Sequence, residues 1–148
     1  MDGLSRDEIA KYVEELAKSF LVKDSISDFM KIPDIMGIYG RVKNDPKWFV
    51  AENVVGYAAY NLNKLRSVRK ASILLDRESR EKIEALYDES KSKIVENTIK
   101  AIKLMLSSDA NSKELVEILG EIALTSTKIS DFLSYEEPSK ILNMVEEE

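Results

Sequence analysis

Apolar residues recur every three or four positions along most of this chain, and this spacing constrains its fold more than any other feature. One face of an α-helix repeats with that period, whereas a half-buried strand alternates with a period of two. No segment alternates convincingly, so we expect no sheet. Only five glycines and three prolines occur in 148 residues, which leaves little material for turns. We therefore predict one all-α domain over residues 1–148, a single-domain helical bundle of about five to seven helices.

Start and stop signals divide the N-terminal part into short helices. Ser5 and Glu8 have the spacing of a capping box, which predicts the start of a first helix. A second, short helix is expected from residues 24–25 until Pro33, because the residue before a proline avoids helical geometry. A third short segment is expected over residues 34–40, where a glycine closes it.

Two long helices are predicted in the middle of the chain. Asp45 followed by Pro46 combines a capping residue with proline at the first helical position, which starts a helix over about 46–72. Asp76 can cap the next helix, over about 77–106.

The C-terminal part is expected to be broken into shorter pieces. A second capping-box pair predicts a short helix over 111–123, and the Thr-Ser-Thr triplet at 125–127 is interpreted as a loop. One or two further turns follow over 129–133. A last short helix starts at Pro138, and the acidic residues 146–148 are expected to form a frayed tail.

Residues 48–62 are apolar nearly all round the predicted helix. A helix of that kind is usually the buried centre of a domain or a contact between subunits. Its aromatic residues are interpreted as core more readily than as the lining of a ligand pocket. If the segment is a contact between subunits, the candidate interface residues are Trp48, Phe49, Val55 and Tyr60.

Positive charge is concentrated in the middle of an otherwise acidic protein. Residues 64–103 carry eleven Lys and Arg against seven acids, whereas residues 1–63 carry eight against ten and residues 104–148 three against ten. A local excess of this kind can face a polyanion or an acidic partner protein.

The candidate nucleic-acid-binding residues are Lys64, Arg66, Arg69 and Lys70. The last three fall within about 100° of one another on a helix with 3.6 residues per turn, so they could grip successive phosphates. The more common explanation of such a group is a solvated helix end, where cations suit the negative end of the helix dipole. Most of the charge after Asp76 is explained by pairs spaced four residues apart, namely Glu78/Lys82, Glu89/Lys93, Glu96/Lys100, Arg77/Glu81 and Arg80/Glu84.

The composition argues against most catalytic chemistry. Cys and His are absent, which removes thiolate nucleophiles, zinc–thiolate sites and the usual acid/base side chain near neutral pH. Glu81-x-x-Glu84 resembles half of the metal-binding pattern of all-α nucleotide pyrophosphatases, and that resemblance implies a Mg²⁺-dependent enzyme. The second Glu-x-x-Asp of that family is absent downstream. We therefore expect no enzyme, no metal site and no cofactor.

The chain has no run of 18 apolar residues, and its N-terminus is too polar for a signal peptide. We therefore expect a cytoplasmic protein without membrane contact. Gln is absent as well, while Lys, Glu and Ile are abundant, a composition that leans towards a thermophile.

Three functions follow from these features. The leading hypothesis is a non-catalytic helical subunit of a larger assembly that contacts other subunits and the backbone of RNA or DNA without sequence specificity. In size, helicity and charge layout the chain is broadly similar to the helical small subunits of CRISPR effector complexes. The alternative is a protein-interaction or regulatory domain that is homodimeric through the apolar helix over 48–62. A Mg²⁺-dependent nucleotide pyrophosphatase is the third.

Overall fold

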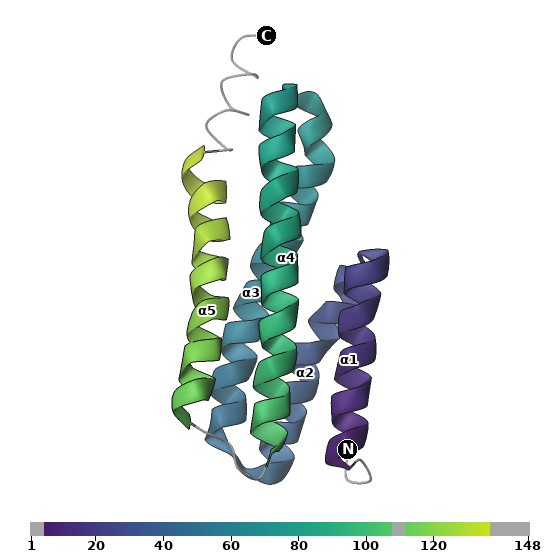
Figure 1. The fold of residues 1–148 in the computed structure, drawn as a ribbon, viewed down its shortest axis with the longest axis vertical. Coiled ribbons are helices and arrows are strands. Elements are labelled where there is room, and N and C mark those ends of the chain that lie inside the picture. The colour runs from purple at the N-terminus through teal and green to yellow at the C-terminus, as the bar shows by residue number, and fades with distance from the viewer. Residues whose placement is uncertain (1–4, 108–111, 137–148) are drawn as a thin grey trace.

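The structure, a computed structural model, describes residues 5–107 and 112–136 and folds them into five α-helices (Figure 1). The helices are α1 Arg6–Lys23, α2 Ile26–Lys43, α3 Pro46–Ala71, α4 Arg77–Leu106 and α5 Ser112–Asp131. A 3₁₀ turn, Ser72–Leu74, joins α3 to α4, and a π-helical turn, Phe132–Glu136, follows α5. The described residues contain no strand, so the predictions of an all-α bundle and of two long helices are confirmed.

Successive helices run in opposite directions, and the first four form a closed ring. α1 packs against α2, α2 against α3, α3 against α4, and α4 returns to α1. α5 packs against α3 and α4, on the side of α4 away from α1 (Figure 1). Because α3 and α4 have 26 and 30 residues against 18 in α1 and α2, they project beyond the α1–α2 turn as a helical hairpin. The buried apolar side chains form one cluster inside this bundle.

Helix starts lie where the capping signals predict them. The Glu8 N–H donates to the Ser5 hydroxyl at 3.2 Å, and the Ser5 N–H donates to the Glu8 carboxylate at 3.3 Å, which completes the capping box. Asp45 caps α3, and Asp76 caps α4 by accepting from the Ser79 N–H at 2.7 Å. These contacts satisfy N–H groups that the helices themselves leave without a partner.

The prediction of two short helices on either side of Pro33 is wrong, because α2 runs through this proline. Pro33 cannot donate a hydrogen bond to the preceding turn, which costs about 3 kcal/mol. The same helix buries Phe29, Ile32 and Met36 completely, and each such side chain contributes roughly 1.5–3 kcal/mol. Burial of this face therefore outweighs the local penalty, and α2 ends only at Lys43.

The predicted loop at 125–127 is also wrong, since α5 is continuous across it. The hydroxyls of Thr125, Ser126 and Thr127 each donate to the carbonyl four residues earlier, all at 2.9 Å. A hydroxyl that bonds back to its own helix needs no water, so Thr125 and Ser126 can be buried within it. The capping residue predicted at position 111, the helix predicted from Pro138 and the tail predicted at 146–148 lie outside the described residues.

Candidate nucleic-acid interface

The α1–α2 turn places a carboxylate against the side of the projecting hairpin. Asp24 ends α1 in the left-handed conformation, with φ 57° and ψ 32°, and its N–H donates to the Phe20 carbonyl at 2.9 Å. Aspartate is among the few residues other than glycine that tolerate this conformation. The side chain of Asp24 extends from this turn to α3 and α4.

Four side chains from α3 and α4 donate hydrogen bonds to this carboxylate. Oδ2 accepts from Arg66 Nε and Arg69 Nη2, both at 3.0 Å. Oδ1 accepts from the Tyr87 hydroxyl at 2.5 Å and from the Lys91 ammonium at 2.9 Å. We call these five residues the Asp24 cluster. It ties the α1–α2 turn to both helices of the hairpin.

The donors keep Asp24 ionised. Burial on its own would raise the pKa of this carboxyl, but the hydrogen bonds from Tyr87, Lys91 and Arg66 outweigh burial and lower the pKa from 3.8 to about 2. Burial raises the pKa of Tyr87, and the hydrogen bond that its hydroxyl donates to Asp24 raises it further. Tyr87 therefore stays neutral and serves as a donor.

The cations of the cluster also cover aromatic rings. The Arg69 guanidinium lies 4.5 Å from the centroid of Tyr87, and Lys91 Nζ lies 4.6 Å from that of Phe20. Both rings are completely buried. The exposed fraction of the side chain is 24% for Arg66 and 30% for Arg69, but only 12% for Lys91. The two arginines therefore reach solvent, whereas the lysine is nearly enclosed.

Three of the four predicted nucleic-acid-binding residues lie together in the structure. Arg66 and Arg69 share Asp24, and Lys70 is exposed in the same last turns of α3. We call Arg66, Arg69 and Lys70 the basic flank. Lys64 lies about 120° or more from each of them around the helix axis. Its ammonium lies instead 4.9 Å from the centroid of the Tyr60 ring.

Sequence reasoning missed the residues that hold the basic flank in place. Asp24 or Ser25 was expected to start a helix, and neither Tyr87 nor Lys91 was named as part of a site. Asp24 is 42 positions from Arg66 and 67 from Lys91. No local spacing rule connects residues that far apart. The sequence offered one signal: Asp24 is acidic and lies in the N-terminal part, whereas Lys and Arg are concentrated over residues 64–103.

The candidate interface residues divide between core and surface. Trp48 and Val55 are buried in the chain's own core, with 2% and 0% of their surface exposed. Phe49 is half-buried, and Tyr60 is 53% exposed. Only part of the apolar helix is thus open to a partner.

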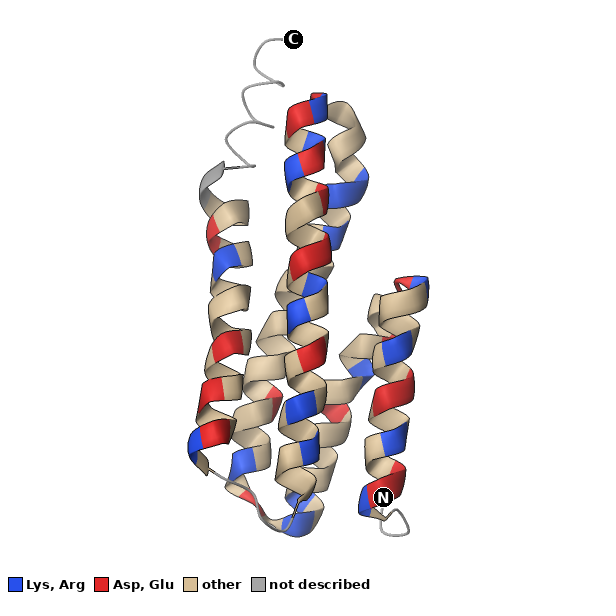
Figure 2. Cartoon of the chain, viewed as in Figure 1, with Lys and Arg blue, Asp and Glu red and all other residues tan. Residues whose placement is uncertain are grey.

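Acidic side chains on α4 are exposed and lie among cations. Figure 2 shows Lys and Arg interspersed with Asp and Glu along this helix. Glu81 pairs with Arg77 at 2.9 Å, and Glu89 pairs with Lys93 at 3.1 Å, as the spacing predicts. In the described parts of the chain, no group of three or more Asp or Glu side chains is placed so that it could hold a metal ion.

No protein-family model, no curated protein and no solved structure matches this chain. Among the residues that the structure describes, no helix is both long enough and apolar enough to cross a membrane.

Proposed function

We propose that this protein is a non-catalytic helical subunit of a larger assembly that contacts the sugar–phosphate backbone of a nucleic acid through its basic flank. The observation that carries the proposal is the charge of the Asp24 cluster. Three cations converge on one carboxylate, so an excess of two positive charges remains. Lys70 adds a third positive charge beside the cluster.

The arginines keep hydrogen-bonding capacity for a second anion. A guanidinium carries five N–H donors, and each arginine uses only one of them on Asp24. Asp24 and the Tyr87 ring hold Arg69 in place, which lowers the entropy lost when a phosphate binds. Charge-assisted contacts from arginine to phosphate are among the strongest polar contacts in proteins.

The site favours contact with the sugar–phosphate backbone over recognition of individual bases. Base stacking needs an exposed aromatic ring, but Tyr87 of the cluster and Phe20 beside it are completely buried beneath cations. Contacts to phosphate position a protein on a strand but carry no sequence information. Binding through this flank should therefore be independent of sequence.

The test is fluorescence anisotropy at low salt with labelled single-stranded oligonucleotides of unrelated sequence. We expect similar affinity for each sequence and weaker binding by Lys70→Glu. Lys128→Glu is the matched control, because Lys128 is also an exposed lysine in the last turn of its helix. Arg66→Glu and Arg69→Glu should weaken binding as well, but they also remove contacts to Asp24 and need a parallel check of folding.

Either of two results would refute the proposal. One is the absence of binding at low salt. The other is equal weakening by Lys70→Glu and Lys128→Glu, which would indicate a general effect of net charge.

The second candidate function is a homodimeric interaction domain. It is favoured by an exposed stripe on α3, where Val50, Tyr57 and Tyr60 are 56%, 47% and 53% exposed and lie within about 80° of one another. Light scattering separates the two candidates, because a dimer that is broken by Tyr57→Glu would favour this one.

A further inference from the structure

A cavity of about 360 Å³ opens at the other end of the bundle from the Asp24 cluster. Ligand sites in proteins commonly start at about this volume. The cavity lies at the end of the bundle where α1 and α3 begin and α2 and α4 end. Figure 1 shows these helix ends at the same end of the bundle. Its lining includes Arg6 of α1, Tyr39 and Lys43 of α2, Lys47 and Trp48 of α3, and Met105 of α4.

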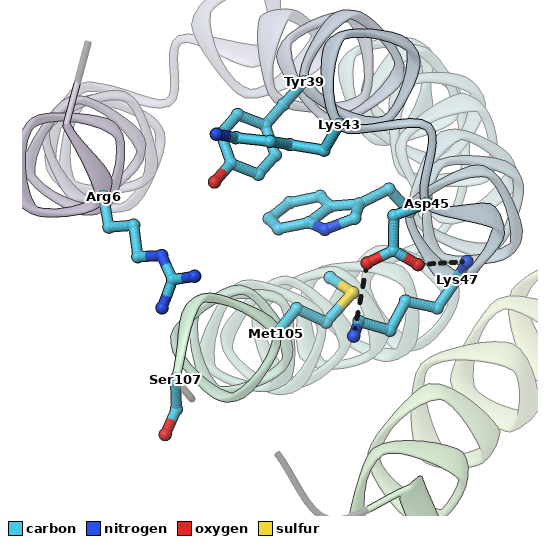
Figure 3. Close-up of a pocket in the computed structure, with 8 residues that line it drawn as sticks. Arg6, Tyr39, Lys43, Asp45, Lys47, Met105 and Ser107 are labelled. Carbon is cyan, nitrogen blue, oxygen red and sulfur yellow. Dashed lines mark hydrogen bonds and ion pairs between the residues drawn. The ribbon is translucent and has the colours of Figure 1, made fainter. Parts of the chain in front are cut away.

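Cations from three helices surround this space. Figure 3 shows Arg6 across the cavity from Lys43 and Tyr39, with Asp45 and Lys47 on a further side. Asp45 is the acidic residue among the described residues of the lining, so these residues carry an excess of two positive charges. In a hollow with low-dielectric walls such an excess attracts anions.

Existing contacts use only part of the donor capacity of these cations. Arg6 Nη1 donates to the Leu106 carbonyl at 3.0 Å, which leaves four of five guanidinium N–H groups. Lys47 Nζ pairs with Asp45 at 3.2 Å. The Lys43 ammonium lies 5.7 Å from the centroid of the Tyr39 ring and, within the described part of the chain, forms no ion pair. Lys43 therefore keeps the three N–H donors of its ammonium for a ligand.

The wall beside Lys43 and Lys47 is closely packed. Tyr39 and Trp48 meet edge to face, with centroids 4.7 Å apart and planes at 62°, and only 7% and 2% of their surface is exposed. Tyr39 and Lys43 are four residues apart on α2, so they lie on the same face of the helix. A binding site set on packed helix ends loses little entropy when a ligand arrives.

We propose that this cavity binds a single phosphate group, either free or carried as a monoester. Such a group carries a charge of about −1.5 to −2 at neutral pH, which matches the excess of two positive charges. Its oxygens suit the fork of a guanidinium and the point charge of an ammonium. The ligand is either inorganic phosphate or the phosphate of a small organic molecule. This inference does not depend on the proposed contact with nucleic acid.

The chain contains one tryptophan, and it lines this cavity. Tryptophan fluorescence of the intact protein therefore reports on binding without a label. The probes are inorganic phosphate, adenosine monophosphate and adenosine, with sodium chloride at matched ionic strength. We expect a saturable change with the first two at millimolar concentration or below, and none with adenosine or chloride. A response to adenosine monophosphate alone would assign the site to organic phosphates.

Lys43→Gln should weaken phosphate binding roughly tenfold, as expected when one hydrogen bond to a charged group is lost. Lys23→Gln is the matched control, because Lys23 and Lys43 are the last residues of α1 and α2 and each precedes a left-handed capping residue. Lack of a saturable response in the unaltered protein would overturn the proposal. Equal weakening by both variants would overturn it too.

Discussion

Asp24 joins three separate helices of the chain, α1, α3 and α4. Its carboxylate accepts from Arg66, Arg69, Tyr87 and Lys91 while its backbone ends α1. A partly buried carboxylate loses part of its hydration, and here four hydrogen-bond donors replace that hydration. The cluster therefore both joins the turn to the hairpin and presents the arginines to solvent.

Asp24→Asn should lower the free energy of unfolding by on the order of 2 kcal/mol at pH 7. The reason is that the folded structure lowers the pKa of the Asp24 carboxyl from 3.8 to about 2. The carboxyl has a lower pKa in the folded state, so its contribution is present above pH 3.8 and is lost as the pH falls towards 2. Urea denaturation should show the gap between the variant and the unaltered protein closing over that range. Asparagine also tolerates the left-handed backbone, so the turn is kept while the charge and one acceptor oxygen are lost.

Asp34→Asn provides the control for this experiment. Asp34 is exposed on α2, and surface substitutions of this kind usually change stability by less than about 0.5 kcal/mol. Two results would contradict the role assigned to the cluster. One is a loss of stability in Asp34→Asn as large as that in Asp24→Asn. The other is a loss of stability in Asp24→Asn that does not change with pH.

Residue-level prediction from sequence succeeded only where a local rule applied. The helical period placed Arg66, Arg69 and Lys70 on one flank, and the structure agrees. The same rule separates Lys64 from them, because 3.6 residues per turn put it on another side. Asp24, Tyr87 and Lys91 join the site through tertiary packing, which no spacing within one helix encodes.

Helix starts were predictable because capping is local, whereas helix interiors were not. Ser5, Asp45 and Asp76 each cap a helix where expected. At Pro33 and at 125–127 the local signal for a break was overruled by burial of the helix and by hydroxyls that bond back to it. Such competition depends on the partners of a helix, which the segment's own sequence does not contain.

Two glycines in helix interiors should respond to substitution with opposite sign. A Cβ on Gly40 of α2 would lie 2.7 Å from Trp48 Cβ, an atom fixed to the α3 backbone. Gly40→Ala should therefore destabilise the protein by about 1–3 kcal/mol. A Cβ on Gly120 of α5 would meet nothing within 4 Å, so Gly120→Ala should stabilise it by about 0.5–1 kcal/mol.

Thermal or urea denaturation of the two variants checks this pair. Stabilisation by Gly40→Ala would mean that α2 and α3 do not pack closely near Trp48. Destabilisation by Gly120→Ala would mean that another group packs against α5 at that position.

At the scale of the whole molecule, unequal helix lengths create the candidate surfaces. The long α3–α4 hairpin passes the α1–α2 turn, and the Asp24 cluster forms where the turn meets it. The other end, where the four ring helices begin or end, holds the cationic cavity. The basic flank and the cavity thus lie near opposite ends of α3 and can be tested independently.

The salt dependence of nucleic-acid binding tests the central claim most directly. Three cations on the basic flank predict that the logarithm of the binding constant falls with the logarithm of salt concentration with a slope of about −2 for a single strand. Lys70→Glu should make the slope shallower by the contribution of about one phosphate contact, while Lys128→Glu should leave the slope unchanged. A slope near zero, or the same slope for Lys70→Glu as for the unaltered protein, would contradict the account.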